Sequence, residues 1–397
     1  MLRVLELFAG IGACSKALTN LEIDHEIVDA VEIDRFAIAS FNAIHGTNFE
    51  PQDIREWDKD IKVDLLMHGS PCQDFSIAGK LAGGDKGSGT RSSLMYETLR
   101  IVEKIKPKYV IWENVKNLLS QKHFHNFEAY QKALEDMGYH NFYKVLNAKG
   151  FGIPQNRERV FTVSIRDGIA NDFKFPEEEP LKVTLKWFLE ESVDEKFYLT
   201  DEQVASLINS NYDQNKRFYE VDGVSPTIST MGGGQRQPKI AEPFVVASRG
   251  RGEKGNISQH LEARHDGTTN TLTSVQKDNY VAIRTANSKG YDLAKDGDEI
   301  DLAYPESETR RGRVGHGVCK TLPTSDSQGV LDNFRIRKLT PKECWRLMGF
   351  DDADFAEAQK INSNTQLYKQ AGNSIVVDVL EAILTNLLKG DSDAQCM

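Results

Sequence analysis

The sequence predicts an α/β fold in which a mostly parallel sheet carries helices on both faces, with a smaller, mainly β and loop-rich domain added to it. Three observations predict this. Residues 1–165 alternate short apolar runs with segments of helical period, as expected for a sheet that is buried on both sides. Residues 176–180 form a linker of proline and glutamate, and the chain beyond it is rich in Gly, Thr, Ser, Asn and Arg. A helical pattern returns from Leu367.

The apolar runs and amphipathic segments define the expected elements of the first domain. Strands are expected at Val4–Phe8, Glu26–Glu32, Val63–Met67, Tyr109–Glu113, Tyr143–Asn147 and Val160–Ile165. Helices are expected at Ser15–Leu21, Arg35–His45, Leu94–Lys104 and Phe124–Met137, and Val376–Leu388 is expected to be helical and to pack back on this domain. Since ligands on such sheets bind outside the carboxyl ends of the strands, residues that follow strands are the candidates for a site.

The changes in composition place the domain boundaries. Residues 1–168 form the first domain, residues 169–350 the second, and residues 351–397 a segment that returns to the first. Inside the second domain a degenerate repeat aligns Thr227, Thr271 and Thr321, and two of its copies are followed by a strand-like piece that leads to Arg249 or Arg284. Duplication explains this pattern, and chance similarity in a threonine-rich stretch is the alternative.

Composition and charge restrict the class of protein. No run of 18 apolar residues occurs, so no membrane span is expected. The five cysteines show no CxxC spacing, which argues against a disulfide framework and against a zinc site, so we expect no metal. The net charge is −10, but residues 230–345 hold 18 Lys/Arg against 15 Asp/Glu, whereas residues 1–60 hold 5 against 12. A nucleic-acid contact would therefore lie in the second half.

The first candidate site is the glycine turn at residues 8–12, Phe-Ala-Gly-Ile-Gly, between a strand and a helix. Glycines there let a ligand approach the backbone at the positive end of a helix. Glu32 ends the next strand, where a carboxylate suits the two hydroxyls of a ribose. Because the third glycine of a dinucleotide motif is missing, a smaller adenosyl ligand is favoured. A surface acid that caps a strand is the alternative for Glu32.

The second candidate is Cys72, in the loop Gly69–Ser76 that directly follows a strand. A cysteine at the carboxyl edge of a sheet is well placed as an exposed thiolate, the form that attacks carbon. Residues 79–90, rich in Gly, Lys and Ser, could close over a substrate. An inert cysteine is the alternative.

A third group of candidates lies on the same rim. Glu113 ends a strand, and a carboxyl group close to a nucleophile can act as an acid or a hydrogen-bond donor. Arg157 and Arg159 alternate after residues 150–154, so they share one face of an extended chain and could hold a phosphate and a base carbonyl. A solvated charge run is the alternative for the two arginines.

In this order the motifs resemble those of the DNA (cytosine-5) methyltransferase family, of bacterial or phage type. The resemblance covers residues 1–165 and 335–388. Its six blocks are Phe-x-Gly-x-Gly at 8–12, Pro-Cys-Gln at 71–73, Glu-Asn-Val at 113–115, Gln-x-Arg-x-Arg at 155–159, residues 337–350, and Gln-Ala-Gly-Asn-Ser-Ile at 370–375. It implies a Rossmann-like class I S-adenosylmethionine-dependent methyltransferase fold, with residues 169–350 as the target-recognition domain.

The resemblance also implies a role for each matching residue. Cys72 corresponds to the nucleophile that adds to carbon 6 of a flipped-out cytosine, Glu113 to the carboxyl group that engages nitrogen 3, and Arg157 and Arg159 to arginines that hold the base and the catalytic loop. The implied cofactor is S-adenosylmethionine, at Phe8, Gly10, Ile11, Gly12, Glu32, Asp53, Ile54, Pro71, Asn373 and Ser374. Two departures from the family pattern, Glu6 in place of Asp and Ala13 in place of Gly, lie at the cofactor turn.

The expected substrate is a specific double-stranded DNA sequence. The candidate DNA contacts are Gln73, Ser76, Arg249, Arg251, Arg310, Arg311 and Arg313. We expect a monomer in the cytoplasm of a bacterial or phage-infected cell, with any cognate restriction endonuclease acting separately.

Three other activities are alternatives to this one. A branch of the family that methylates RNA carries Cys-Phe-Thr, and no cysteine here is followed by Phe-Thr. Methylation of amino groups uses a Pro-Pro loop, and the chain contains no Pro-Pro. A catalytically dead DNA-binding protein would not be expected to keep Cys72, Glu113 and both arginines. The sequence does not show which bases are recognised or which group removes the proton from carbon 5.

Overall fold

The structure, a computed structural model, divides the chain into two compact units that are described separately. It describes residues 1–71, 91–170, 172–199, 219–220, 223–230, 237–242, 246–251, 258–263, 281–284, 291–294, 299–301, 314–315, 328–330 and 335–394. Unit 1 comprises Met1–Leu189, Asp222–Pro238 and Leu339–Met397, and unit 2 comprises Glu190–Val221 and Lys239–Lys338.

The boundaries of these units differ from those expected at residues 168 and 350. Residues 169–189, 222–238 and 339–350 belong to unit 1, because polar contacts tie them to it. The Glu179 amide donates to the Gly150 carbonyl, and the Arg346 guanidinium donates to the Leu189 carbonyl at 3.1 Å. The proline and glutamate residues at 176–180 predicted a linker between domains, and their composition does not indicate these contacts.

Unit 1 is built on a sheet of strand order β2-β1-β3-β4-β7-β5. Its strands are β1 (Leu2–Leu7), β2 (His25–Val31), β3 (Leu65–His68), β4 (Tyr109–Val115), β5 (Tyr139–Asn147) and β7 (Glu158–Arg166). Neighbours from β2 to β4 are parallel, whereas β7 runs antiparallel to both β4 and β5. The expected mostly parallel α/β sheet is confirmed.

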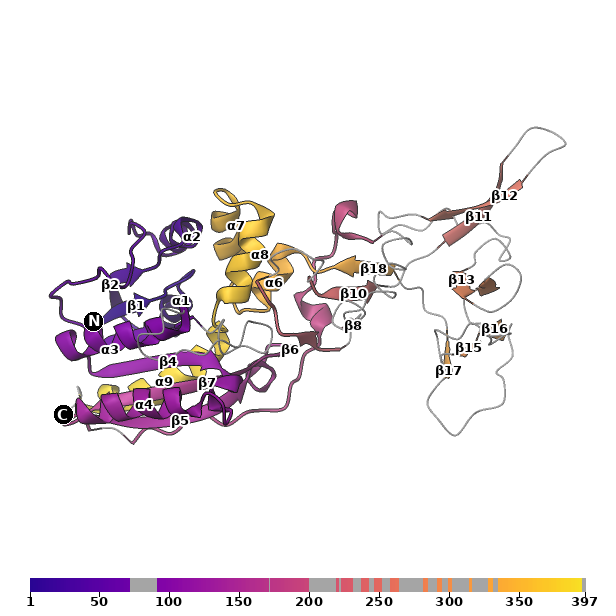
Figure 1. Ribbon diagram of the computed structural model, residues 1–397. Coiled ribbons are helices and arrows are strands. Elements are labelled where there is room, and N and C mark those ends of the chain that lie inside the picture. Colours follow the sequence, from indigo (N-terminus) through magenta and orange to yellow (C-terminus); the bar gives the residue numbers. More distant parts are fainter. Residues whose placement is uncertain are drawn as a thin grey trace. The chain divides into compact units, whose positions relative to one another are not determined.

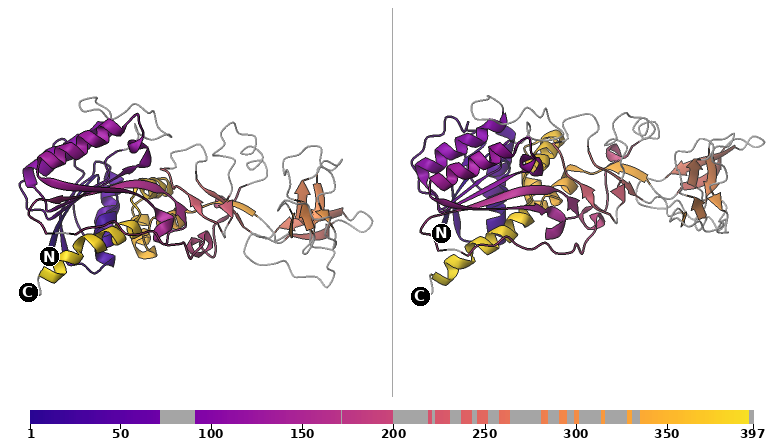
Figure 2. Two further views of the ribbon diagram at one scale, coloured as in Figure 1. Left: turned by 90° about the horizontal axis from the view of Figure 1, so that it is seen from below. Right: turned by 60° about the horizontal axis from the view of Figure 1, so that its bottom comes forward.

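The helices of unit 1 cover both faces of this sheet. They are α1 (Ala13–Asn20), α2 (Arg35–His45), α3 (Met95–Ile105), α4 (Phe124–Asp136), α6 (Pro341–Arg346), α7 (Asp352–Gln359), α8 (Asn364–Asn373) and α9 (Val377–Ala394). Figures 1 and 2 show α3 and α4 side by side on one face and α9 on the other, and α9 packs against α1 as expected. Short 3-10 turns are η1 (Arg91–Leu94), η2 (Lys116–Leu119), η3 (Ala148–Phe151), η4 (Leu185–Phe188) and η5 (Glu195–Phe197).

Helices α6 and α7 were not expected from the sequence, although both begin at strong capping residues, whereas the helical pattern expected from Leu367 falls on α8 and α9. Thr340 accepts from the Glu343 amide and Glu343 reaches back to the Thr340 amide, with Pro341 in the first turn. Asp351 and Asp354 form the same reciprocal cap on α7. Lys16 of α1 forms ion pairs with Asp351 and Asp354 at 2.7 and 2.8 Å, so these helices dock on the N-terminal half of unit 1.

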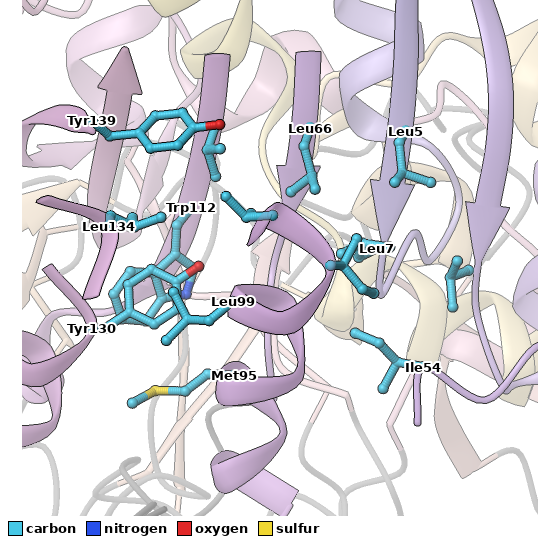
Figure 3. Packing of buried hydrophobic residues seen from close by; sticks show 14 of the residues in the cluster. Leu5, Leu7, Ile54, Leu66, Met95, Leu99, Trp112, Tyr130, Leu134 and Tyr139 are labelled. Carbon is cyan, nitrogen blue, oxygen red and sulfur yellow. The ribbon is translucent and has the colours of Figure 1, made fainter. Parts of the chain in front are cut away.

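The main core lies between the sheet and helices α3 and α4. Figure 3 shows Leu66 and Trp112 of the strands facing Leu99 of α3 and Tyr130 of α4. These four side chains are at most 8% exposed. Burial of such large side chains contributes about 1.5–3 kcal/mol each, so this core fixes the strands whose carboxyl ends carry the candidate residues.

Glu6 joins β1 to the first turn of α1 from a buried position. Its Oε1 accepts from the Ser15 amide at 3.0 Å and from the Ser15 hydroxyl. Glu6 is only 3% exposed. Burial raises the pKa of Glu6 from 4.5 to about 7, against the opposing effect of the Ser15 hydrogen bonds. The carboxyl group therefore anchors the end of the turn at residues 8–12.

Unit 2 contains short strands in small sheets. One sheet has the order β18-β10-β8, with β18 at Arg335–Lys338, β10 at Lys239–Glu242 and β8 at Tyr219–Glu220. The others are β11 (Val246–Arg251) with β12 (Ser258–Ala263), β13 (Val281–Arg284) with β14 (Tyr291–Ala294), and β15 (Glu299–Asp301) between β16 (Val314–Gly315) and β17 (Gln328–Val330). This agrees with the expected mainly β character of the region.

The predicted repeat is only partly visible. Its first copy, at residues 224–230, contains β9 (Ser225–Pro226), which pairs in unit 1 with β6 (Gln155–Asn156). The copies at residues 268–274 and 318–324 lie outside the described residues. The duplication stays a prediction.

One stretch of the described residues, Asn364–Lys389, is long and apolar enough to cross a membrane by length and composition. It contains α8 and the part of α9 up to Lys389, which are separated by non-helical residues 374–376. Leu380, Ile383 and Leu387 of α9 are fully buried, as expected for a helix whose apolar face belongs to the core.

We predict that Gly372→Ala destabilises unit 1 by about 1–3 kcal/mol, the usual cost of overpacking. A Cβ at this position would lie 2.2 Å from the carbonyl group of Ser229, a backbone atom that cannot turn aside. Thermal unfolding measures the effect. Thr365→Ala, on an exposed position of the same helix, is the matched control and should change stability by less than about 0.5 kcal/mol; equal melting temperatures for the two variants would contradict the packing.

We predict a pH-dependent stability difference between the natural chain and Glu6→Gln. Because the pKa of Glu6 is raised to about 7 in the folded state, the unfolded chain binds fewer protons there, and the contribution of Glu6 to stability falls as pH rises from about 4.5 to about 7. The total is on the order of 3 kcal/mol. Chemical unfolding between pH 4.5 and 8 measures it, and a difference that stays constant with pH would refute the assignment.

Candidate active site

The register of the sheet brings the candidate residues to one edge. Val31 pairs with Leu7, Leu7 with His68, and His68 with Trp112, so these residues form one row across β2, β1, β3 and β4. The next residue on each strand is Glu32, Phe8, Gly69 and Glu113, respectively. Parallel pairing therefore aligns the glycine turn, the loop that leads to Cys72 and the catalytic candidate Glu113 at the carboxyl edge of the sheet.

The glycine turn has the backbone shape that a close ligand requires. Phe8, Gly10 and Gly12 have φ of 52°, 57° and 82°, and left-handed φ is costly for Phe8 because it has a Cβ. A Cβ on Gly10 would meet no atom of the described residues within 4 Å, whereas a Cβ on Gly12 would lie 2.2 Å from His45. Within the part of the chain that the structure describes, Gly10 thus faces open space, and Gly12 is required for packing on α2.

His45, the last residue of α2, contacts the same turn. Its Nε2 lies 3.2 Å from the Ile11 carbonyl, and burial lowers the pKa of His45 to about 4. The neutral ring can therefore donate to Ile11, as one of its nitrogens carries the proton. His45 was not predicted as a site residue, because nothing in the sequence around a histidine at the end of an amphipathic helix indicates a contact with the glycine turn.

Glu32 lies beside Gly10 and follows the last residue of β2. Its Oε2 accepts from the Gly10 amide at 3.0 Å and its Oε1 from the Asp34 amide at 2.8 Å. Burial raises the pKa of Glu32 despite these hydrogen bonds. The carboxyl group is thus both an anchor of the glycine turn and an acceptor at the rim.

The loop that contains Asp53 and Ile54 is attached next to Glu32. The Gln52 amide donates to the Glu32 carbonyl, and Arg100 of α3 donates to the Ile54 carbonyl at 2.8 Å. Ile54 is 4% exposed and belongs to the core. Asp53 pairs with Arg55, which lowers the pKa of Asp53, so it presents an ionised carboxylate.

These residues fit S-adenosylmethionine. Open space at Gly10 adjoins the Glu32 carboxyl group, which suits ribose hydroxyls, and the Gln52 contact ties the Asp53 loop to the same strand end. Among the other expected cofactor residues, Ser374 ends α8 and is 5% exposed, and Asn373 is exposed. Pro71 is the last described residue before Cys72.

The loop from Gly69 to Pro71 is held by the two residues that flank Glu113. The Trp112 Nε1 donates to the Ser70 hydroxyl at 3.0 Å, and the Asn114 amide donates to the Ser70 carbonyl at 3.2 Å. Ser70 is 4% exposed. The chain is therefore fixed two residues before Cys72, directly beside Glu113.

Glu113 is paired with Arg159 at this rim. Its Oε1 lies 3.1 Å from the Arg159 Nε, and the residue is 8% exposed. The other oxygen, Oε2, faces the loop, because a Cβ on Gly69 would lie 3.8 Å from it. The two oxygens thus have separate surroundings, one beside a cation and one beside the segment that precedes Cys72.

Arg157 has a different place from Arg159. It is 4% exposed, and its guanidinium donates to the carbonyl groups of Ile228 and Ser374 at 3.0 and 2.7 Å. Gln155, which is fully buried, accepts from the Ile228 amide and donates to the Leu347 carbonyl. Arg157 and Gln155 therefore clamp residues 225–228 to the ends of α6 and α8.

Several candidates cannot be placed. Cys72, Gln73 and Ser76 lie outside the described residues, as do Arg310, Arg311 and Arg313. Arg249 and Arg251 lie on β11 of unit 2. Within the residues that the structure describes, no group of three or more His, Cys, Asp or Glu side chains could hold a metal ion.

Two solved structures share the fold. A crystal structure of a Spodoptera frugiperda DNMT2 variant matches with a TM-score of 0.61 and 18% identity, over 98% of this chain and 100% of that chain. The Dnmt2 methyltransferase of S. pombe matches with a TM-score of 0.59 and 19% identity, over 98% and 99% of the two chains. At these identities the likeness concerns the fold.

Sequence comparisons identify the family. The chain is similar to the orphan methyltransferase M.SPBetaI of Bacillus phage SPbeta, with 32% identity over 98% of this chain and 97% of that protein. It is also similar to the type II methyltransferase M2.ScrFI of Lactococcus lactis subsp. cremoris, with 31% identity over 98% and 99%. Residues 2–389 match the family model of C-5 cytosine-specific DNA methylases. The chain therefore belongs to this family of DNA (cytosine-5) methyltransferases, which depend on S-adenosylmethionine.

Proposed function

We propose that the chain methylates carbon 5 of cytosine within a specific double-stranded DNA sequence, through a covalent bond between Cys72 and a flipped-out base. The observation that carries the proposal is the position of Glu113. Its neighbours Trp112 and Asn114 both bind Ser70, so its carboxyl group lies beside the segment that continues into Cys72. A nucleophile and an acid at one rim are what the reaction requires.

The reaction needs a nucleophile because carbon 5 of an aromatic cytosine is unreactive. The Cys72 thiolate adds to carbon 6, a carbon–sulfur bond forms, and carbon 5 gains enamine character. Bound S-adenosylmethionine supplies the electrophilic methyl group. Carbon 5 then loses its proton to a base, the carbon–sulfur bond breaks, and the thiolate of Cys72 is regenerated.

Glu113 supports the addition step through nitrogen 3 of the ring. Oε1 is beside the Arg159 guanidinium, and Oε2 faces Gly69. We assign Oε2 as the atom that holds a proton or hydrogen bond at nitrogen 3, because the other oxygen is held by the ion pair. This interaction withdraws electron density from the ring, so that carbon 6 accepts the thiolate more readily.

The two arginines have separate roles in this proposal. Arg159 orients the Glu113 carboxyl group and remains close enough to the rim to contact the base. Arg157 acts as a positioning residue, because its guanidinium binds the backbone carbonyls of Ile228 and Ser374. It holds the Gly-Asn-Ser segment, which we assign to the cofactor site.

Unit 2 is the proposed target-recognition domain. A cytosine inside a duplex cannot reach Cys72, so it must be flipped out at a cost of a few kcal/mol, and contacts to phosphates and base edges compensate this cost. Gln73 and Ser76 beside the nucleophile, and Arg249, Arg251, Arg310, Arg311 and Arg313 in unit 2, are the proposed contacts.

The cellular setting is inferred from the relatives. One is named an orphan methyltransferase of a Bacillus phage and another a type II methyltransferase of Lactococcus lactis. We infer a monomer that acts in the cytoplasm of a bacterial or phage-infected cell. A restriction endonuclease of matching specificity, where one exists, acts as a separate protein.

The first prediction of this proposal is a covalent complex that depends on Cys72. Long duplex DNA copied with 5-fluorocytosine in place of cytosine contains every candidate target, so the recognised sequence need not be known. With S-adenosylmethionine, the natural chain should form a complex that survives denaturing electrophoresis, because fluorine cannot leave as a proton does. Cys72→Ser should form none, while Cys344→Ser, at a buried cysteine of α6, should behave as the natural chain; a complex with Cys72→Ser would refute the role.

The second prediction concerns Glu113→Gln. Loss of the acid at nitrogen 3 should reduce the turnover rate about 10²–10⁴-fold, while binding of duplex DNA is retained. Methyl transfer to DNA and gel-shift titration measure the two effects. Glu158→Gln is the matched control: Glu158 is an exposed acid on the same rim, paired with Lys116, and its loss should change turnover less than about fivefold. Equal turnover in both variants would count against Glu113.

A further inference from the structure

A chain of hydrogen bonds runs through the core behind the Cys72 segment. The Thr98 hydroxyl lies 2.6 Å from the Met95 carbonyl and 2.7 Å from the Tyr130 hydroxyl, and the Tyr130 hydroxyl lies 2.8 Å from the His68 Nε2. Thr98 and Tyr130 are fully buried and His68 is 1% exposed. Three buried polar side chains from β3, α3 and α4 thus form one network.

The number of protons fixes the direction of each bond. Thr98 has one hydroxyl proton, which it donates to the Met95 carbonyl, so it accepts from Tyr130. The Tyr130 oxygen is then left to accept from His68, whose Nε2 must carry a proton. The Nδ1 of His68 is consequently a bare acceptor, and it is buried with no hydrogen-bond partner among the described residues.

The neutral state of His68 agrees with this assignment. Burial lowers the pKa of His68 to about 3, so the ring carries a single proton, the one on Nε2. A second proton on Nδ1 would be a buried donor without an acceptor, which is costly. Each group of the network therefore has one arrangement of protons.

The network joins both flanks of the segment that contains Cys72. On one side, His68 is the last residue of β3, and its ring stacks on Trp112 with centroids 5.8 Å apart; Trp112 in turn binds Ser70. On the other side, Met95 and Thr98 lie in the first turn of α3, which follows the segment. Figure 3 shows Tyr130 beside Trp112, with Met95 and Leu99 of α3 close by.

We propose that Tyr130 is a positioning residue for methyl transfer: its hydroxyl, bonded to His68 and to Thr98, fixes the distance between the end of β3 and the start of α3. This rests on the proposed function, in which Cys72 is the nucleophile. Residues 69–71 are anchored at Ser70 and α3 is anchored at Thr98, so the spacing of these two anchors fixes where the chain enters and leaves the segment that contains Cys72. Displacement of a nucleophile by about 1 Å is enough to cost up to 10²-fold in rate.

Tyr139 offers a matched control for Tyr130. Its hydroxyl donates to the Pro107 carbonyl at 2.7 Å, and the residue is 3% exposed. Both tyrosines belong to the same core, and Figure 3 shows them apart, with Tyr139 near Leu134 and Tyr130 near Met95. Loss of the Tyr139 hydroxyl removes one buried hydrogen bond and loss of the Tyr130 hydroxyl removes two, but of the two residues only Tyr130 links the flanks of the Cys72 segment.

The experiment compares Tyr130→Phe with Tyr139→Phe and the natural chain. It measures the rate of covalent complex formation on the 5-fluorocytosine duplex, the KM for S-adenosylmethionine, the affinity for duplex DNA and the melting temperature. We expect Tyr130→Phe to form the complex about 10- to 100-fold more slowly, with KM and DNA affinity within about twofold of the natural chain. Tyr139→Phe should form it at the natural rate, although its melting temperature also falls because a buried hydrogen bond is lost.

Equal rates for the two variants would overturn the proposal, as would a slow rate that is explained entirely by a raised KM. If Tyr130→Phe does not fold, Thr98→Val carries the test, because it removes the bond between α3 and Tyr130, together with the local bond from Thr98 to the Met95 carbonyl, and keeps the bond between Tyr130 and His68; slower complex formation supports the proposal and a natural rate overturns it. Failure of the proposed function is distinct, since the natural chain would then form no complex that requires Cys72.

Discussion

The arrangement of the site depends on the register of four parallel strands. Because Val31, Leu7, His68 and Trp112 are paired across the sheet, the residues after them meet at one edge although they lie up to 105 positions apart in the chain (Phe8 to Glu113). A slip of one residue in any strand would move its side chains to the other face. The glycine turn, Glu32, the Ser70 loop and Glu113 could then not share a site.

Much of this could be predicted from the sequence because it is encoded locally. The apolar runs at residues 4–8 and 109–113 predicted β1 and β4. The position of Glu32 at the end of a strand predicted a carboxyl group at the carboxyl edge of the sheet, where Glu32 is found to accept from the Gly10 amide. Such features follow from the period of a strand and from the way parallel strands end. The strands predicted for the first domain differ from the observed strands in their first and last residues. For example, β5 starts at Tyr139 rather than at the predicted Tyr143.

The features that could not be predicted depend on contacts between distant segments. The pairing of Gln155 with Leu347 joins residues 192 positions apart, and nothing near either residue indicates it. The same holds for residues 222–238, which have the composition of the second domain but are clamped to the first by Gln155 and Arg157. Buried polar residues such as His68 and Tyr130 look like ordinary core positions until their partners are known.

The division of the chain has a consequence for how such enzymes diversify. Residues 239–338 form one uninterrupted piece of unit 2, whereas the short segment 222–238 before them stays with unit 1. Recombination that exchanges residues 239–338 would therefore replace most of unit 2, the proposed target-recognition domain, with two crossovers, and would leave the contacts of Arg157 intact. A chimera joined at residue 169 would instead take Arg157 from one parent and Ile228, whose carbonyl accepts from Arg157, from the other. The contact between them would then depend on two sequences that did not evolve together.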